Sequence, residues 1–304
     1  MKGPPLRSEK PTRKTHARGK LLAVAGLLAI AVSGCSPIVQ RGWMPGYEDG
    51  PVTNMTDRIT NHWVGAWTAA LLVGVLVWGL TIWCIIVYRK RKGDSQLPVQ
   101  TRYHLPLEIL YTVVPLIMVG VLFFYAQRDM TAMRDVSQTP DVEIEVYGKQ
   151  WSWDFNYLTD DAYDTGEQIN NVGELEGSLG DRGTHESFPT LYLPVNERVQ
   201  FHLTSRDVVH SFWVPAFLDK MDMFPAQTNT WQIVPMREGV YAGKCAELCG
   251  EFHSGMLFNV KVVSRAEYDA HIESLKEAGQ TGRLGEEYSR MQADNTSTSE
   301  GSEN

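Results

Sequence analysis

The sequence predicts a two-helix transmembrane hairpin followed by an all-β domain. Two long apolar runs, residues 64–88 and 105–126, are each long enough for a membrane-spanning helix, which needs about 20 residues. From about residue 140 the pattern changes to short runs in which apolar and polar residues alternate, as in strands with one buried face. The composition, 43% hydrophobic and 21% charged, excludes a disordered chain, a collagen and a disulfide-dense miniprotein.

Residues 1–34 have the pattern of a secretion signal. They hold seven Lys or Arg, one acid and an apolar stretch, residues 21–33, that is too short to span a bilayer. Small residues lead directly into Cys35, and this ending resembles the bacterial lipobox, in which the Cys becomes the lipidated first residue of the mature chain. We expect a lipoprotein signal; the alternative is a plain signal peptide with an incidental Cys. Residues 35–62 would then form an extracytoplasmic N-terminal segment.

The hairpin spans residues 63–127. The run 64–88 has 25 residues without a charge, and the run 105–126 has 22 residues with one acid. The loop between them, residues 89–104, begins with four adjacent cations, which predicts that it lies in the cytoplasm. The signal and the loop agree on topology: two helices in a bacterial plasma membrane, with everything after the second helix outside.

The one acid of the second run, Glu108, has two interpretations. Pro106 fits the first position of a helix, and an acid in the first turn is favoured by the helix dipole. An ionisable residue within a membrane segment is also a functional candidate.

The β-domain is expected over residues 140–265, as an antiparallel sandwich or barrel. Its clearest strand candidates are short β-rich or alternating runs, at residues 142–146, 191–195, 199–204, 231–234 and 256–263. Residues 158–189 interrupt the pattern with eight acids and one Arg, and we expect a solvated insertion without regular structure. The C-terminal tail, residues 266–304, begins with a short amphipathic stretch that predicts a helix.

The charge is unevenly distributed. The whole chain carries -8, but residues 1–34 carry +6, so the mature chain carries -14. Because such a field repels phosphate, we expect no nucleic-acid partner.

The chemistry is concentrated in residues 245–256, which contain the pattern C-x3-C-x3-H-x2-M. His210 lies 35 residues upstream of the first Cys, at the end of a strand-like run. Thiolate and thioether ligands favour copper, and imidazole suits it too. Two thiolates can bridge two copper ions, which leaves one His for each metal and Met256 with a backbone carbonyl as weak outer ligands.

Three other interpretations of this segment compete. Cys245 and Cys249 could form a disulfide outside the cell, although His210, His253 and Met256 would then have no explanation. Two Cys and two His could hold a structural zinc, which has no need of Met256. The arrangement could also be a chance grouping in the core.

Three segments together resemble a known family. Residues 245–256, HSFWVP at 210–215 and GKQWSW at 148–153 are similar to subunit II of the haem-copper cytochrome c oxidases, and the resemblance covers about residues 55–265. The lipobox, the acidic insertion and the two-helix layout are similar to actinobacterial aa3-type members.

The resemblance implies a cupredoxin-like Greek-key barrel for the β-domain and a binuclear copper centre, called CuA, within it. The implied ligands are His210, Cys245, Cys249, His253, Met256 and the backbone carbonyl of Glu247. The side chain of Glu247 would reach a magnesium ion shared with subunit I. Glu108 matches an acid at the mouth of a proton pathway into that subunit.

Trp151 matches the aromatic residue through which an electron enters. From the residues alone it is as well explained as a core residue, because alternation predicts that Trp151 and Trp153 share one face of a strand. This sequence departs from the family's pattern after Pro225, where Ala226 and Gln227 stand in place of an Arg. A contact with subunit I that uses that Arg is therefore in doubt.

The predicted function is therefore the electron-entry subunit of a cytochrome c oxidase, which passes electrons to haem in subunit I for oxygen reduction coupled to proton pumping. The chain has no C-x-x-C-H haem motif, so its donor is expected to be a separate cytochrome c or a cytochrome c domain of a bc complex. Other expected partners are the remaining oxidase subunits and membrane lipid. The copper residues exclude a quinol oxidase. The alternatives are a membrane-anchored copper carrier or sensor and a zinc-stabilised lipoprotein.

Overall fold

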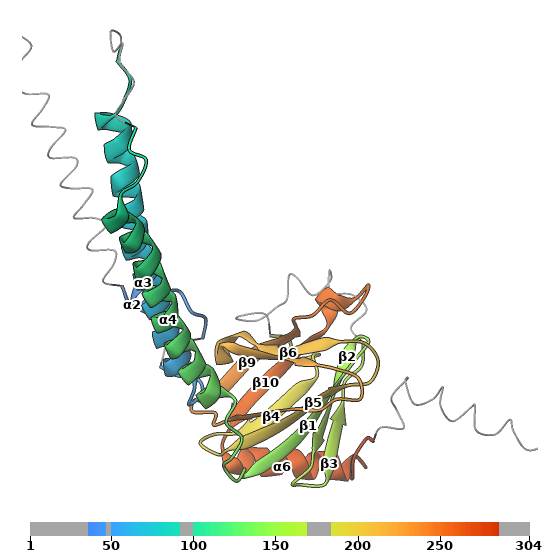
Figure 1. Ribbon diagram of the computed structural model, residues 1–304. Helices are drawn as coiled ribbons and strands as arrows, with labels where there is room; N and C mark the ends of the chain where they lie inside the picture. The colour runs from blue at the N-terminus through green and yellow to red at the C-terminus, as the bar shows by residue number, and fades with distance from the viewer. Residues whose placement is uncertain (1–35, 47–49, 92–99, 169–183, 286–304) are drawn as a thin grey trace, which may run out of the picture. The chain divides into compact units, whose positions relative to one another are not determined.

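The computed structural model describes residues 36–46, 50–91, 100–168 and 184–285. The chain divides into two compact units, residues 1–43 and 44–304. The described part of the first unit contains the short helix α2 (Pro37–Gln40). Cys35 and the expected signal lie outside the described residues. The second unit holds the helical hairpin and the β-domain (Figure 1).

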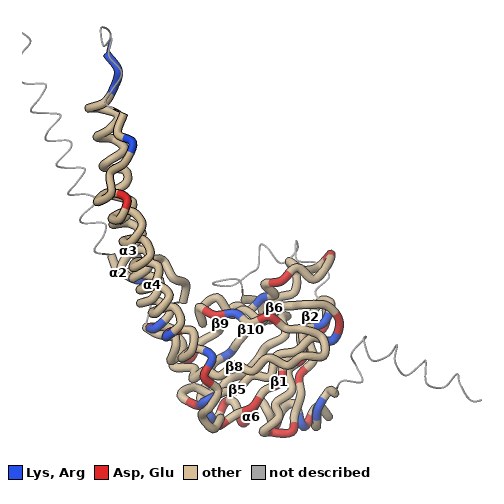
Figure 2. The backbone as a smooth tube through the Cα atoms, in the orientation of Figure 1, with Lys and Arg blue, Asp and Glu red and all other residues tan. Residues whose placement is uncertain are grey.

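The hairpin consists of α3 (Thr56–Val87) and α4 (Leu105–Met133), and both are long and apolar enough to cross a membrane. Most of its length carries no charged residue, whereas both signs of charge are spread over the β-domain (Figure 2). Both helices extend beyond the predicted apolar runs into polar residues: α3 begins at Thr56 and α4 ends at Met133. There the buried carboxylate of Asp129 in α4 accepts hydrogen bonds from Arg58, at 3.0 Å, and His62, at 2.9 Å, so the two helices are antiparallel.

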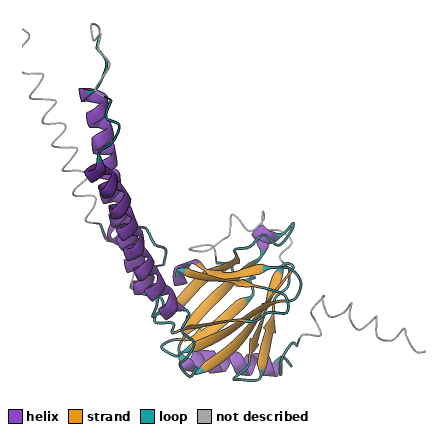
Figure 3. Cartoon of the chain, viewed as in Figure 1, coloured by secondary structure: helices purple, strands orange, loops and turns teal. Residues whose placement is uncertain are grey.

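Two five-stranded sheets form the β-domain within the described residues (Figure 3). The first has the order β3-β2-β1-β5-β8 and the second has the order β4-β10-β9-β6-β7. The strands of the first sheet are β1 (Val142–Lys149), β2 (Ser152–Tyr157), β3 (Ala162–Thr165), β5 (Val199–Ser205) and β8 (Asn229–Ile233). Those of the second sheet are β4 (Thr190–Pro194), β6 (His210–Val214), β7 (Asp219–Met223), β9 (Gly239–Cys245) and β10 (Leu257–Val263).

The pairing is mixed, so the expectation of a purely antiparallel sandwich is wrong. Strand β1 pairs with β5 in parallel, and β10 pairs with β4 in parallel. The other described pairs of neighbouring strands are antiparallel. Alternation along one strand reports which face is buried but not the direction of its neighbour, so the sequence pattern could not distinguish the two arrangements.

An aromatic core fills the space between the sheets. The ring centroids of Trp153 in β2 and Phe258 in β10 lie 4.8 Å apart, and those of Phe212 in β6 and Phe258 lie 5.0 Å apart. All three side chains are fully buried. Aromatic pairs of this kind stabilise a core beyond their burial by about 0.5–1.5 kcal/mol each. The ends of β6, β9 and β10 are therefore held on a rigid base.

The expected insertion is partly ordered, which corrects the prediction for residues 158–189. Its first part folds into β3, which pairs with β2 from Tyr157↔Ala162 to Asp154↔Thr165. The turn between these strands is tight, and Asp161 takes a positive φ of 56° there. Ala162 is buried, so one apolar residue among many acids was enough to anchor a strand. Residues 169–183 lie outside the described part of the chain.

The predicted C-terminal helix is confirmed as α6 (Arg265–Glu277). Ser264 and Glu267 form a capping box at its start, in which each side chain binds the other residue's backbone N–H. Tyr268, Ile272 and Leu275 recur at helical spacing and are buried. In Figure 1 the helix runs along one edge of the β-domain.

Candidate metal centre

The residues of the candidate centre come from the ends of three neighbouring strands. His210 is the first residue of β6, Cys245 is the last residue of β9, and Met256 directly precedes β10. These strands are adjacent in the order β10-β9-β6, so their ends meet at one edge of the sheet. The expectation that His210 ends a strand is wrong, because the strand begins there.

Cys249 and His253 lie on the connection between β9 and β10. The backbone N–H of Cys245 donates to the carbonyl of Met256 at 3.0 Å, which closes the connection at its base. Gly250 takes a positive φ of 124°, and the chain turns sharply after Cys249. The 3-10 turn η3 (His253–Gly255) follows, and its first residue, His253, supplies the second imidazole of the cluster after that of His210. This local folding turns the side chains of the motif toward one another.

The donor atoms form a continuous cluster. The two sulfur atoms of Cys245 and Cys249 lie 3.9 Å apart. His210 Nδ1 lies 3.8 Å from the first sulfur, and His253 Nδ1 lies 3.5 Å from the second. Met256 Sδ lies 3.8 Å from the Cys249 sulfur. The structure therefore brings together the five side chains that the sequence analysis named, and their role as ligands stays a prediction.

A backbone carbonyl completes the cluster on the other side. The carbonyl oxygen of Glu247 lies 3.2 Å from the Cys245 sulfur. The side chain of Glu247 itself is exposed, so the carbonyl and the carboxylate face different surroundings. The expected dual use of this residue is compatible with that geometry, and its role toward magnesium stays a prediction.

The cluster fits a soft metal. The donor atoms of His210, Cys245 and Cys249 all lie within 4.8 Å of one another, and the three side chains are buried. Two thiolates, two imidazoles and a thioether suit copper. Hard cations such as calcium and magnesium prefer oxygen ligands, which these side chains do not offer. The sulfur atoms are well beyond the bonding distance of about 2.05 Å, so they form no disulfide in this structure.

The two thiols have very different acidities. A hydrogen bond with Cys249, helped by one with His210, lowers the pKa of Cys245 far below its ordinary value, although burial opposes this shift. The same hydrogen bond and burial raise the pKa of Cys249. Two buried sulfurs in contact share one proton more readily than they both ionise. A bound metal cation would favour the thiolate form of both residues.

Asp207 is a functional residue that the sequence analysis missed. Its Oδ1 lies 2.8 Å from His210 Nε2, and its Oδ2 accepts a hydrogen bond from the backbone N–H of Gln150 at 2.8 Å. Burial opposes a charge on either partner, but their mutual hydrogen bond lowers the pKa of Asp207 and raises the pKa of His210. A carboxylate on one ring nitrogen orients the other toward a metal. An acid three residues before a candidate His was the available signal.

Trp151 lies beside the cluster, in the turn between β1 and β2. Its indole Nε1 donates to the carbonyl of Cys249 at 3.2 Å, and its ring meets that of Phe252 edge to face at 4.9 Å. The side chain is half-buried, whereas Trp153 is fully buried. The premise that both share one strand face is wrong, because β1 ends at Lys149 and β2 begins at Ser152. Trp151 therefore lies against the connection between β9 and β10, and its role in electron entry stays a prediction.

Glu108 is not part of this cluster. It lies near the start of α4, is half-buried, and accepts a hydrogen bond from the backbone N–H of His104 at 2.9 Å. His104 is the N-cap and its Nδ1 accepts from Leu107 N, so Pro106 occupies the second helical position rather than the first. The contact demonstrates a capping role for Glu108. Its role in proton uptake stays a prediction.

Comparisons with known proteins agree with this geometry. The family model described as "Cytochrome C oxidase subunit II, periplasmic domain" matches residues 142–263. A probable cytochrome c oxidase subunit 2 of Streptomyces avermitilis is 44% identical over 301 residues, which cover 91% of this chain and 93% of that protein. The chain belongs to the subunit II family of the cytochrome c oxidases.

Other relatives extend the comparison. The cytochrome c oxidase subunit 2 of Mycobacterium tuberculosis is 34% identical over 298 residues, which cover 83% of this chain and 80% of that protein. A crystal structure of the periplasmic domain of subunit II of cytochrome oxidase (CoxB) of Bradyrhizobium japonicum is 27% identical, covers 46% of this chain and 97% of that chain, and gives a TM-score of 0.41.

Membership confirms the resemblance inferred from the three motifs, and with the two packed sheets it confirms the cupredoxin-like fold class. The family implies a copper centre in the β-domain, where the cluster around Cys245 and Cys249 can bind metal. Two apolar helices and the match to a periplasmic domain indicate a membrane-anchored chain with an extracytoplasmic β-domain. The oxidoreductase role belongs to the haem-copper oxidase as a complex.

Proposed function

We propose that this chain is the electron-entry subunit of its oxidase and that it receives electrons from a cytochrome c at a binuclear copper centre. One observation carries the proposal: two buried thiols lie 3.9 Å apart, with an imidazole nitrogen within 3.8 Å of one sulfur and another within 3.5 Å of the other. A structural zinc would use the two Cys and two His but has no need of Met256, whose Sδ lies 3.8 Å from the Cys249 sulfur. When bound, two coppers bridged by thiolates would supply a site that takes up one electron with little change in geometry.

The protein's own residues would hold this site rigid and dry. His210, Cys245, Cys249, His253 and Met256 would be the side-chain ligands, with the Glu247 carbonyl as the sixth. All the side chains except His253 are buried, so water is largely excluded from the sulfur atoms. His210, Cys245 and Met256 lie at or next to the ends of strands. Their backbone is therefore already ordered and would lose little conformational freedom when a metal binds.

Electron entry is assigned to Trp151. Its ring is half-buried, and its Nε1 is hydrogen-bonded to the carbonyl of the ligand residue Cys249. A donor that contacts the exposed part of this ring would be separated from the ligand shell by one hydrogen bond. The mature chain would carry -14, which would attract a basic donor or donor domain.

The remaining roles follow the family resemblance. The hairpin would pack against subunit I in the bacterial plasma membrane, with Glu108 at the entrance of a proton pathway and the Glu247 carboxylate at a shared magnesium ion. Subunit I would hold the haem that receives the electrons, reduces oxygen and pumps protons. Cys35 would carry lipid as the first residue of the mature chain, after removal of residues 1–34.

The test is purification of the chain in mild detergent with its partners. The proposal expects two coppers per chain, the absorption of a mixed-valence copper pair, and co-purifying haem subunits. Reduced cytochrome c should bleach that absorption. A colourless protein with one zinc, or a copper protein that purifies alone and exchanges its metal readily with chelators, would refute the proposal.

A further inference from the structure

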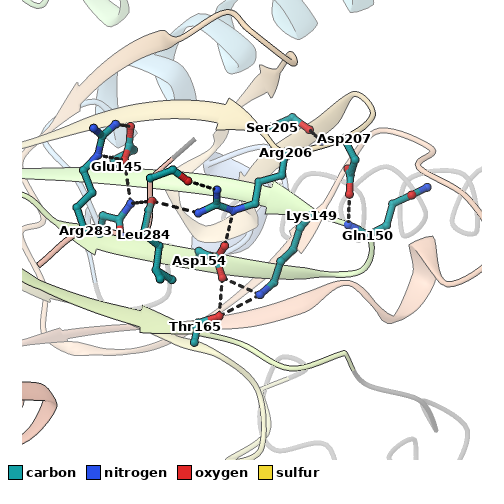
Figure 4. Close-up of polar contacts among 12 residues, drawn as sticks. Glu145, Lys149, Gln150, Asp154, Thr165, Ser205, Arg206, Asp207, Arg283 and Leu284 are labelled. Atoms are coloured by element: carbon teal, nitrogen blue, oxygen red, sulfur yellow. Dashed lines mark hydrogen bonds and ion pairs between the residues drawn. The ribbon is translucent and has the colours of Figure 1, made fainter. Parts of the chain in front are cut away.

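Arg206, which directly precedes Asp207 in the sequence, forms a buried ion pair with Asp154 of β2 (Figure 4). The side chains of Arg206 and Asp154 are each 3% exposed, and Arg206 Nε donates to Asp154 Oδ2 at 2.6 Å. The guanidinium also stacks on the ring of Tyr147, 3.8 Å from its centroid. Lys149 Nζ and Thr165 Oγ1 donate to the other carboxylate oxygen, each at 2.7 Å. Buried charges are tolerated only where nearly every donor and acceptor is used, so the guanidinium needs further acceptors.

The C-terminal segment, residues 280–285, supplies those acceptors. Arg206 Nη1 donates to the carbonyl of Gly285 at 2.7 Å, and Nη2 donates to the carbonyl of Leu284 at 3.2 Å. Arg has the planar fork that can reach a carboxylate and two carbonyls together, whereas Lys offers a single point charge. The ion pair is therefore complete only when this segment is in place.

The segment is itself fastened to the first sheet (Figure 4). The backbone N–H and carbonyl of Leu284 both bind the side-chain amide of Asn156 in β2, each at 3.0 Å. Arg283 forms a two-point ion pair with Glu145 of β1, whose side chain is only 7% exposed. Gln280 accepts a hydrogen bond from the backbone N–H of Tyr163 at 3.0 Å. These contacts hold the segment on β1, β2 and β3.

Arg206 connects this support to the metal centre. Its backbone N–H donates to the carbonyl of Gly148 at 2.9 Å. A Cβ at Gly148 would lie 2.9 Å from the ring of His210, so this backbone lies directly against the ligand. The next residue is Asp207, whose two oxygens bind His210 Nε2 and the backbone N–H of Gln150. An anchored residue 206 therefore determines where the Asp207 carboxylate can lie.

We propose that Arg206 is a positioning residue for the copper centre, and that residues 284–285 complete its binding site. It would fix Asp207, and through Asp207 both the ring of His210 and the turn that carries Trp151. This inference rests on the proposed function. A purely structural ion pair would contribute to folding stability but would leave the metal site unchanged once the protein has folded.

The experiment uses the full chain in the purified oxidase complex. In Arg206→Met we expect copper to be lost to a copper(I) chelator faster, by about 10-fold or more, as for other residues that orient a metal ligand. The copper absorption should shift as well. Leu284→Pro removes the N–H that binds Asn156 and leaves the Arg206–Asp154 contact in place, so a smaller change of the same kind is expected.

Two controls separate positioning from stability. Arg265 is a more exposed control arginine, with 39% of its side chain exposed: it pairs with Glu197, its guanidinium lies 4.9 Å from the ring centroid of Tyr268, and neither partner belongs to the metal cluster. Arg265→Met should lower the thermal midpoint without changing the copper spectrum or the rate of copper loss. If Arg206 acts through Asp207, Arg206→Met should add little to the effect of Asp207→Ala.

The outcomes are distinct. If Arg206→Met and Leu284→Pro retain the wild-type spectrum and rate of copper loss, the inference is wrong while the proposed function stands. If Arg206→Met fails to accumulate, Leu284→Pro gives the same two measurements. If the wild-type complex contains no copper, the proposed function fails and this inference fails with it.

Discussion

Replacing Trp151 with Gln should stop electron entry while leaving the metal in place. This half-buried side chain donates a neutral hydrogen bond to the Cys249 carbonyl, meets Phe252 edge to face and packs against the edge of the core. The hydrogen bond and the aromatic contact contribute about 0.5–1.5 kcal/mol each, so with the lost packing the variant should lose at least about 1–3 kcal/mol of unfolding free energy. That loss is too small to dismantle a cluster held by strands.

The donor's affinity should fall by a comparable free energy, but this loss acts directly on electron entry. Truncating an aromatic residue at the centre of an interface costs about 2 kcal/mol or more, which is about 30-fold in affinity. Stopped-flow reduction of the copper absorption by isolated cytochrome c measures this directly, first with wild type and then with the variant. Higher salt should slow the wild-type reaction with a soluble donor, because screening weakens attraction between exposed charges.

The matched control is Gln150→Met. Gln150 Nε2 donates to the same Cys249 carbonyl at 2.8 Å, so its loss weakens the support of the loop without removing the Trp151 ring. We expect reduction within a few-fold of wild type. Equal slowing in both variants would mean that loop support, rather than the ring, explains the result. Normal reduction in Trp151→Gln, or loss of copper with activity, would return Trp151 to the role of a core residue.

The other predictions concern separate parts of the chain. Cys249→Ser should abolish the two-copper absorption, because a hydroxyl does not bridge soft copper as a thiolate does, whereas Met256→Leu should retain both coppers with a shifted reduction potential. Metal analysis gives the copper content and potentiometry gives the potential. Full colour in both variants would contradict the ligand assignment. Glu108→Gln keeps an oxygen that can accept from the helix N-terminus, so helix capping should persist while oxidase turnover falls; unchanged turnover across a pH series would favour capping alone. Intact mass spectrometry should show a chain that begins at Cys35 with added acyl mass, and another N-terminus would refute the lipobox assignment. Burial, helped by the neighbouring Lys261, lowers the pKa of His271 from 6.5 to about 4. The unfolded chain therefore protonates this imidazole at a higher pH than the folded chain, so the free energy of unfolding should fall as pH drops from about 6.5 to 4. In His271→Phe, thermal melts should lose that part of the pH dependence.

Local pattern predicted most of the elements. The apolar runs predicted α3 and α4, and period-two alternation predicted β1 and β5, because burial on one face leaves a trace in the sequence of each strand. The parallel pairings of β1 with β5 and of β10 with β4 were not predictable in this way, since a strand's own sequence does not record its neighbour's direction. Strand β3 was missed because four residues among many acids carry almost no periodic signal.

The ligands could be predicted and their supports could not. The pattern from Cys245 to Met256 contains four candidate ligands of three residue types at short spacing, and that spacing is visible in the sequence. Asp207 acts through a single carboxylate that resembles any surface acid until its contact with His210 is known. Residues 280–285 bind the sheet largely through backbone groups, which every residue possesses, so no residue type identifies them.

The close approach of Gly148 to His210 has a consequence for the proposed route of the electron. Strand β1 leads into the turn of Trp151, and the same strand lies against the ring of His210 with no side chain between them. If Trp151 is the entry residue and His210 a ligand, their movements would be coupled and their separation should vary little with thermal motion. Electron transfer between them would then be free of conformational gating, and a slow opening step would have no place in its kinetics. A side chain at position 148 would push the ring away and introduce that delay.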